Sequence, residues 1–280
     1  MLETLTFMAP PFTAAVIIVG MHSYLGIHVL KRGIIFVDLA LAQMAALGTM
    51  VGIIFGLTPG SGTSFVSSLG FVFLGAVLFS VTRPQDKKIP QEAIIGIIYG
   101  LSIALAMAIA DKLSGGGQHI KEILTGNILW VNWSATSRLI VVYVVVAAFH
   151  ILFRDKFVTI SQDYERAIQR GLSIRLWDFL FFVSFGLVIT LSVPIAGVLL
   201  VFSFLMIPAT ISALFSDKWN SRIMIGWSVG VLACLFGLWY SYTQNAPRGP
   251  AAVCLLAIFL ILSGVLKSLM RSTMESRTKQ

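Results

Sequence analysis

Asp38 and Gln43 stand out chemically because they lie within a long apolar run, FVDLALAQMAALG, at residues 36–48. Carboxylate and amide groups are costly in lipid, so in a membrane helix they face a partner or a cavity. Two ligands at positions i and i+4 share a helical face and can hold a divalent cation together. Asp38 and Gln43 are five residues apart, about 140° around a helix. This pair therefore does not form a metal site by itself.

Two roles remain open for each of these residues. Gln43 lies roughly 16 Å along a helix from Arg32, at about 1.5 Å per residue, which is near the middle of a membrane. We expect its amide either to line a translocation path or to hydrogen bond to a neighbouring helix. Asp38 lies closer to the Arg32 end. We expect it to pair with Lys31, Arg32 or His28, or to act as a gate near that membrane face.

The other candidate ligands are few. His22 is deep within the first apolar segment, and Ser203 could line a polar path. His119 and Glu122, in GGGQHIKE, could contact a metal together if that segment is helical, although a solvated loop histidine is the alternative. We find no spacing typical of a nucleophile and its base or of a catalytic metal. The chain is therefore not expected to be an enzyme.

The composition determines the kind of element that must position these side chains. The chain has 280 residues, of which 57% are hydrophobic and 11% charged, and its mean hydropathy is +0.91. A soluble domain carries about a quarter charged residues. Apolar stretches of about 20 residues recur along the whole chain, and this is the helix length that spans a hydrocarbon core of ~30 Å. We predict an all-α polytopic membrane protein with a single transmembrane domain at residues 1–280.

Nine spans account for the apolar stretches, and the basic residues indicate their orientation. Most of the 20 Lys and Arg residues fall in alternate connections, while Lys112, Lys121, Arg138 and Arg248 fall on the opposite side. The positive-inside rule then places the N-terminus outside and the C-terminus in the cytoplasm. The net charge of +8 thus reflects topology, and nucleic acid is not an expected partner. The predicted spans are 7–30, 33–57, 64–82, 90–111, 136–153, 176–193, 196–216, 222–243 and 250–269.

The long cytoplasmic connection at 154–175 contains a polar helix signal. Ser161 or Asp163 can cap a helix through YERAIQR, and Gly171 is a typical C-terminal stop. Such a helix could be a solvated interfacial helix or a docking site for a cytoplasmic ATPase. Since the chain has no GxxxxGK[ST] loop, any ATP chemistry must belong to another subunit.

The segment DYERAIQRGLSIRLWD resembles the coupling region of the ABC-3 family, the permease subunits of bacterial zinc, manganese and iron ABC importers. Further segments resemble the same family in order along nearly the whole chain: GIHVLKRGIIFVDLALAQMAALG, QEAIIGIIYG with IKEILTGNILWV, and IAGVLLVFSFLMIPATISALFS with GLWYSYTQNAPRGPAAV.

The resemblance implies a type II importer-like permease in the bacterial inner membrane that moves a divalent metal by alternating access. It also implies a homodimer, two cytoplasmic ATP-binding subunits, an extracytoplasmic metal-binding delivery protein, and no tightly bound cofactor. The residues that it implies for ATPase coupling are Asp163, Glu165, Arg166, Ala167, Arg170 and Gly171.

The chain departs from the family in its second helix, where the usual pattern is GDxLxH. Aligned through Phe36 and Gly48, Gln43 takes the place of the His, Leu39 that of the Asp, and Asp38 that of the Gly. This loss leaves two alternatives open. Amide and apolar groups suit a chelated metal better than a bare ion, and a secondary transporter would need no ATPase. Glu92, Asp111 and Asp178 lie at helix ends, which disfavours the secondary transporter.

Overall fold

The computed structural model describes all residues except 1, 84–88, 114–115, 245–247 and 279–280. In the described part of the chain, every regular element is a helix. The elements are α1 (Leu2–Arg32), α2 (Val37–Ile54), α3 (Gly62–Val81), α4 (Gln91–Ala110), α5 (Gly116–Thr125), the 3₁₀ turn η1 (Ile128–Trp130), α6 (Trp133–Leu152), α7 (Arg154–Gln162), α8 (Tyr164–Gln169), α9 (Ile174–Ala196), α10 (Val198–Phe215), α11 (Trp219–Gln244) and α12 (Arg248–Thr278).

The nine predicted spans are confirmed within these described ranges. Nine helices are long and apolar enough to cross a membrane, namely α1 to α4, α6 and α9 to α12. Their bounds differ from the predicted ones by one to five residues, except that α12 ends nine residues later than predicted, at Thr278. The predicted all-α class is therefore correct, and its cause is the recurrence of uncharged apolar runs of membrane-spanning length.

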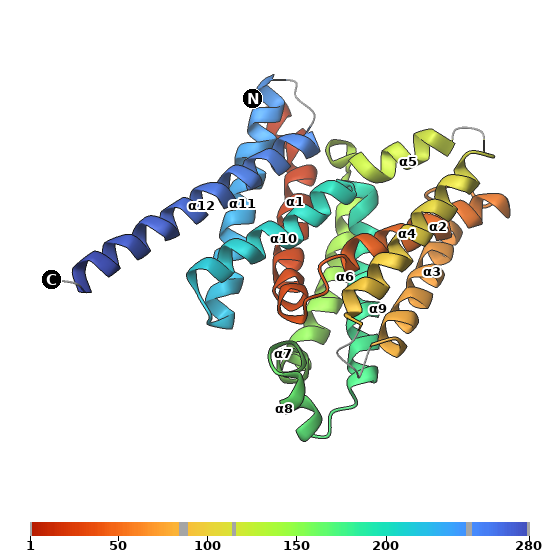
Figure 1. The fold of residues 1–280 in the computed structure, drawn as a ribbon. Coiled ribbons are helices and arrows are strands. Elements are labelled where there is room, and N and C mark those ends of the chain that lie inside the picture. The colour runs from red at the N-terminus through yellow and green to blue at the C-terminus, as the bar shows by residue number, and fades with distance from the viewer. Residues whose placement is uncertain (1, 84–88, 114–115, 245–247, 279–280) are drawn as a thin grey trace.

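The helices pack in two groups (Figure 1). One group contains α1, α10, α11 and α12, and the other contains α2, α3, α4 and α9. The helix α6 packs against α1 and α9 and so joins the groups. The short helix α5 lies at one end of the bundle, and α7 and α8 lie at the opposite end. The predicted placement of segments 112–135 and 154–175 on opposite sides agrees with this arrangement.

Two glycines set how α2 is placed. Gly33 has a φ of 66°, a left-handed conformation that favours glycine, and it allows the tight turn from α1 into α2. Gly48 lies where a Cβ atom would approach Ser67 O and Ser68 Cα to 2.8 Å. Its lack of a side chain therefore permits the close packing of α2 on α3.

The connection at 154–175 contains two helices where the sequence predicted one. Asp163 caps α8, because its side chain accepts a hydrogen bond from Arg166 N at 2.9 Å. The alternative cap, Ser161, was wrong, since this residue lies within α7. Gly171, with a φ of 69°, ends α8 as predicted. Hydrogen bonds from Gly171 N to Ile168 O and from Leu172 N to Ala167 O close the end in a Schellman motif.

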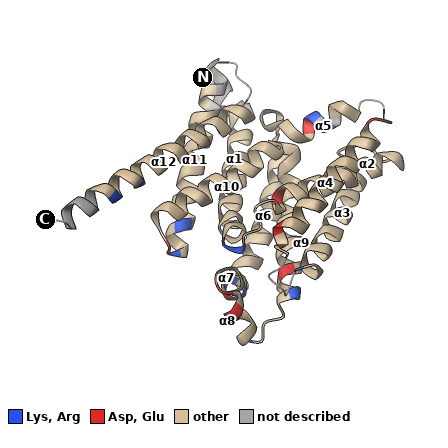
Figure 2. Ribbon diagram, viewed as in Figure 1, with Lys and Arg blue, Asp and Glu red and all other residues tan. Residues whose placement is uncertain are grey.

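The basic residues gather mainly at the end of the bundle that holds α7 and α8, and few lie at the α5 end (Figure 2). The alternate connections that carry most of the Lys and Arg residues in the sequence thus come together at one end of the bundle. We retain the expectation that the α7–α8 end is cytoplasmic.

Candidate functional site

A cavity of about 840 Å³ lies in the half of the bundle next to α5. It is bordered by α2, α3, α5, α6 and α9, and most of its lining side chains are small, apolar or hydroxyl-bearing. Its polar lining side chains are Thr49, Ser61, Ser64, Ser68, Glu122, Asn127, Ser137, Arg138 and Thr190.

The helix α2 leads from this cavity directly to Asp38. Ala42, Ala45 and Thr49 line the cavity. Asp38 lies one turn before Ala42, about 40° from it around the helix and about 20° from Ala45 and Thr49. Its side chain thus continues the lining stripe of α2 away from α5. Asp38 is 1% exposed, and its Oδ1 atom has no hydrogen-bond partner among the described residues.

On α6, Tyr143 lies one turn beyond the cavity-lining Leu139. Tyr143 is buried and donates a hydrogen bond to Val188 O at 3.4 Å. Asp38 is therefore buried one turn beyond the cavity lining of α2, a helix that packs on α9.

The predicted ion pair of Asp38 was wrong. Arg32 pairs with Asp178 at 2.9 Å, and His28 hydrogen bonds to Ser161 at 2.8 Å. Lys31 is exposed. The tight turn after Arg32 explains the result, because it separates the end of α1 from the start of α2 and leaves the arginine directed toward α9.

Gln43 and Leu39 lie at the edge of the same stripe. Gln43 is buried and is about 20° and 60° around α2 from Met50 and Ala46, which both line the cavity. The amide itself does not border the cavity, and Leu39 is half-buried without bordering it either. The role of Gln43 in a path remains a prediction.

His22 and Ser203 are satisfied by contacts within the core. His22 hydrogen bonds through Nδ1 to Ile18 O at 2.8 Å and lies 3.4 Å from Ser192 Oγ through Nε2. Ser203 donates to Leu199 O at 2.8 Å. Neither residue borders the cavity, so their predicted place in the path gains no support from this geometry.

The external candidates lie in α5. This segment is helical, as their pairing requires, and Glu122 borders the cavity and accepts a hydrogen bond from Gln118 Nε2 at 2.9 Å. The side chain of His119 is outside the described residues. Among the residues that the structure describes, no three His, Cys, Asp or Glu side chains are grouped closely enough to hold a metal ion.

The residues expected to dock an ATPase form the outer surface of α8. Glu165, Arg166, Arg170 and Gly171 are exposed, while Ala167 is fully buried and anchors the helix to the bundle. The exposed face carries charges of both signs that are available to another subunit.

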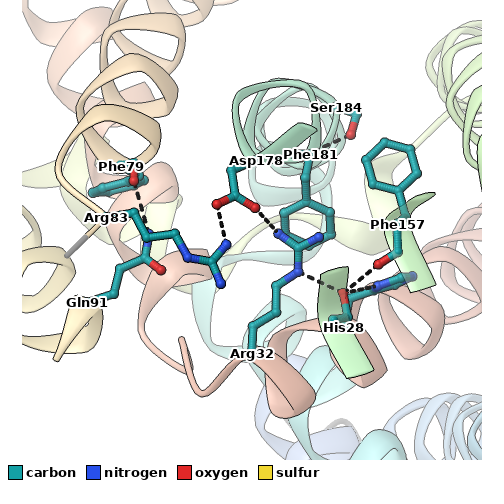
Figure 3. A network of polar contacts seen from close by, with 10 residues as sticks. His28, Arg32, Phe79, Arg83, Gln91, Phe157, Asp178, Phe181 and Ser184 are labelled. Carbon is teal, nitrogen blue, oxygen red and sulfur yellow. Dashed lines mark hydrogen bonds and ion pairs between the residues drawn. The ribbon is translucent and has the colours of Figure 1, made fainter. Parts of the chain in front are cut away.

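A buried ionic network connects this end of the bundle to the spans (Figure 3). Asp178, near the start of α9, forms ion pairs with Arg32 at the end of α1 and with Arg83 after α3. Sequence reasoning placed Asp178 at a helix end and missed its role. The sequence offered no local signal for this role, because the two arginines are far from Asp178 along the chain.

Comparison with known proteins places this arrangement in a family. Residues 4–267 match the ABC 3 transport family. The chain belongs to this family. The resemblance drawn from its sequence segments is thus confirmed, and the protein is a membrane permease of that family.

The relatives of this permease include a manganese transport system membrane protein, MntC, of Listeria innocua. It is 25% identical over 238 residues, covering 82% of this chain and 84% of the relative. A probable iron transport system membrane protein of Haemophilus influenzae is 22% identical and covers 87% of this chain and 84% of its own length.

Two solved structures share the fold of the permease. PsaBC from Streptococcus pneumoniae, in complex with Fab, superposes with a TM-score of 0.79 at 22% identity, covering 94% of this chain and 93% of that one. An inward-facing putative metal-chelate type ABC transporter gives 0.73 at 19% identity, covering 94% and 87%.

Proposed function

We propose that this permease is the transmembrane subunit of an ATP-driven importer for a divalent transition metal such as manganese, iron or zinc. It works as a homodimer in the bacterial inner membrane with its N-terminus outside. Separate cytoplasmic subunits hydrolyse ATP, and an extracytoplasmic protein delivers the metal. The names of the curated relatives, which are manganese and iron transport membrane proteins, support this class of cargo.

The observation that carries the proposal is the buried carboxyl of Asp38, which lacks a partner at Oδ1 and continues the cavity-lining stripe of α2. A buried carboxylate in a membrane is costly unless a cation or a proton compensates it. A divalent cation that descends from the cavity would supply this compensation. A carboxylate oxygen suits manganese better than it suits softer metals.

The weakness of such a site fits transport. A permease must bind its cargo strongly enough to admit it and weakly enough to release it. A single carboxyl group, that of Asp38, would hold a cation only transiently. ATP-driven movement of the helices, and not a tight site, would then determine the direction of movement.

Metal uptake by cells that lack the native gene and carry the variant Asp38→Asn tests the proposal. The measurement is the initial uptake of radioactive manganese, iron and zinc. We expect uptake to fall about tenfold or more, the scale on which the loss of a metal-site partner acts. Asp111→Asn, which removes an exposed acid that follows α4, is the matched control and should transport normally. Normal uptake by Asp38→Asn at equal membrane abundance would mean that the metal path does not use this carboxylate.

A chelated metal is the second candidate cargo, and the size of the cavity favours it. A volume of about 840 Å³ is within the range of about 300–1,000 Å³ found for small-molecule sites, and a bare ion needs far less. Uptake of iron with and without an excess of a hydroxamate chelator separates the candidates. Import of a bare ion should stop when the chelator sequesters the metal, whereas import of a chelate should continue and saturate.

A further inference from the structure

The carboxylate of Asp178 lies between two arginines from different parts of the chain. Arg32 Nη1 is 2.9 Å from Asp178 Oδ1, and Arg83 Nη1 contacts Asp178 Oδ2. The side chain of Asp178 is fully buried, and that of Arg32 is 2% exposed. One carboxylate thus joins the end of α1, the start of α9 and the connection that follows α3 (Figure 3).

Both arginines also contact the cytoplasmic helices. Arg32 Nε donates to Ser161 Oγ of α7 at 2.8 Å. The guanidinium of Arg83 lies 4.4 Å from the ring centroid of Tyr164, the first residue of α8, in a cation–π contact. The expected ATPase docking helix is therefore connected to Asp178 through one intervening side chain.

The other end of the network reaches the helix that borders the cavity. Arg32 is the last residue of α1, and one tight turn separates it from α2. That turn is held from the other side, because Phe36 N donates to Glu92 Oε1 at the start of α4 at 2.8 Å. A displacement of Arg32 is thus passed to α2, which carries Asp38.

Stability does not explain this network well. A buried ion pair contributes little on balance, because desolvation offsets the attraction between its charges. Here two arginines share one carboxylate, so a positive charge remains uncompensated within the network. Arg32 Nη2 is also buried without a hydrogen-bond partner among the described residues. An apolar cluster of equal volume would hold the helices together at lower cost.

We propose that Asp178 is a positioning residue for transport, and that it transmits the movement of α8 to α1 and α2 through Arg83 and Arg32. This inference rests on the proposed function for the identity of the motor, an ATP-hydrolysing subunit on α8. It adds which side chains link that motor to the helices around the cavity.

The test measures how readily a reagent reaches the cavity from solution, so its result does not depend on which cargo is transported. In the complete transporter in nanodiscs, Cys234 and Cys254 are replaced by Ala, and Ser137→Cys reports from the exposed rim of the cavity. The measurement is the rate of labelling with an impermeant thiol reagent, with and without ATP and vanadate. ATP hydrolysis and thermal unfolding are measured on the same samples.

We expect nucleotide to change the labelling rate in the parent. In Asp178→Asn the ratio of the rates with and without nucleotide should fall to about unity, while ATP hydrolysis continues. Arg83→Gln should act in the same direction, and Arg83→Lys should restore part of the response because it keeps the charge. Arg83 is partly exposed, with a side-chain exposure of 17%, so its variants remain informative if Asp178→Asn fails to fold.

Asp217→Asn and Lys218→Gln are the matched controls, since they remove the same charges from exposed positions between α10 and α11. Both should retain the response of the parent. A parent-like nucleotide response in both Asp178→Asn and Arg83→Gln would overturn the inference. A lost response in the variants, together with a parent transporter that responds to nucleotide but moves no divalent metal, would instead leave the inference standing and refute the proposed cargo.

Discussion

Compared with the family pattern, the carboxylate of α2 lies one residue earlier in this chain, and this shift changes what α2 can do. The family pattern places an acid and a histidine on one helical face, whereas this chain has Leu39 and Gln43 there and an acid at Asp38. The shift turns the carboxyl by about 100°. It brings Asp38 onto the stripe formed by Ala42, Ala45 and Thr49, which borders the cavity. The acid is therefore kept near the cavity while the paired ligand set is lost.

A double substitution should restore the missing pair. Leu39→Asp with Gln43→His places a carboxylate and an imidazole four residues apart on one face, which suits a divalent cation. We expect the double variant to bind more zinc or manganese than the parent in detergent, measured by equilibrium dialysis. Gln43→His alone should retain metal longer than the parent and release it more slowly.

The control for this prediction is Leu39→Asp alone, which adds charge without the imidazole. Binding no stronger than that of the parent in the double variant would mean that Gln43 faces away from the path or that the alignment is off by one residue. Normal transport by Gln43→Leu would assign the amide to packing.

Among the elements, α8 is the one whose short length makes its end signals decisive. It has six residues, too few to be stable alone, so its cap and its C-terminal stop must define it. Loss of the Asp163 cap would cost about 1 kcal/mol. Ala167 is fully buried and fixes the orientation of the helix, so that Glu165 and Arg166 face outward.

Reversal of the two outward charges should uncouple the motor. We expect Glu165→Lys with Arg166→Glu to weaken assembly with the ATP-binding subunits, because the complementary charges on the partner would then repel them. The measurements are co-purification of the subunits and transport-coupled ATP hydrolysis, at equal membrane insertion. Asp217→Lys with Lys218→Glu reverses an equivalent exposed pair at the same end of the bundle and is the control. Unchanged coupling in the α8 variant would argue against docking there.

Elements of this chain could be predicted where the signal is local. Apolar length defined the spans, and Asp163 and Gly171 defined the ends of α8. The helix α7 was missed, although its buried Phe157, Ile160 and Ser161 follow a helical spacing.

The Asp178 network could not be derived, because it joins residues 95 and 146 positions apart, and only the packing of α1, α3 and α9 brings them together. The pairing of Asp38 with a nearby base failed for the same reason, since sequence proximity was taken for contact.

At the scale of the whole molecule, the orientation in the membrane is open to direct test. We expect Gly117→Cys in α5 of intact spheroplasts to react with an impermeant thiol reagent. Gln169→Cys at the end of α8 should not react until the membrane is opened. Both positions are exposed, so protection would reflect the membrane and not burial. The background again lacks Cys234 and Cys254.

The choice of Gly117 over its neighbour follows from packing. A Cβ atom at Gly116 would overlap the backbone of Ala110, whereas one at Gly117 has no atom within 4 Å. The reverse labelling pattern, with Gln169→Cys accessible from outside, would overturn the orientation and with it the assignment of α8 to the cytoplasm.

The helix α12 extends away from the bundle over its second half (Figure 1). From Ile261 to Ser272 its residues are exposed apart from the half-buried Ser263, and its 24-residue apolar part would be about 36 Å long. This exceeds a hydrocarbon core of ~30 Å, and such hydrophobic mismatch is relieved by tilting. The contacts of α12 with α10 and α11 set the angle of the helix within this chain, so its exposed end must accommodate the mismatch. A thinner membrane would therefore leave more of that end outside the hydrocarbon core.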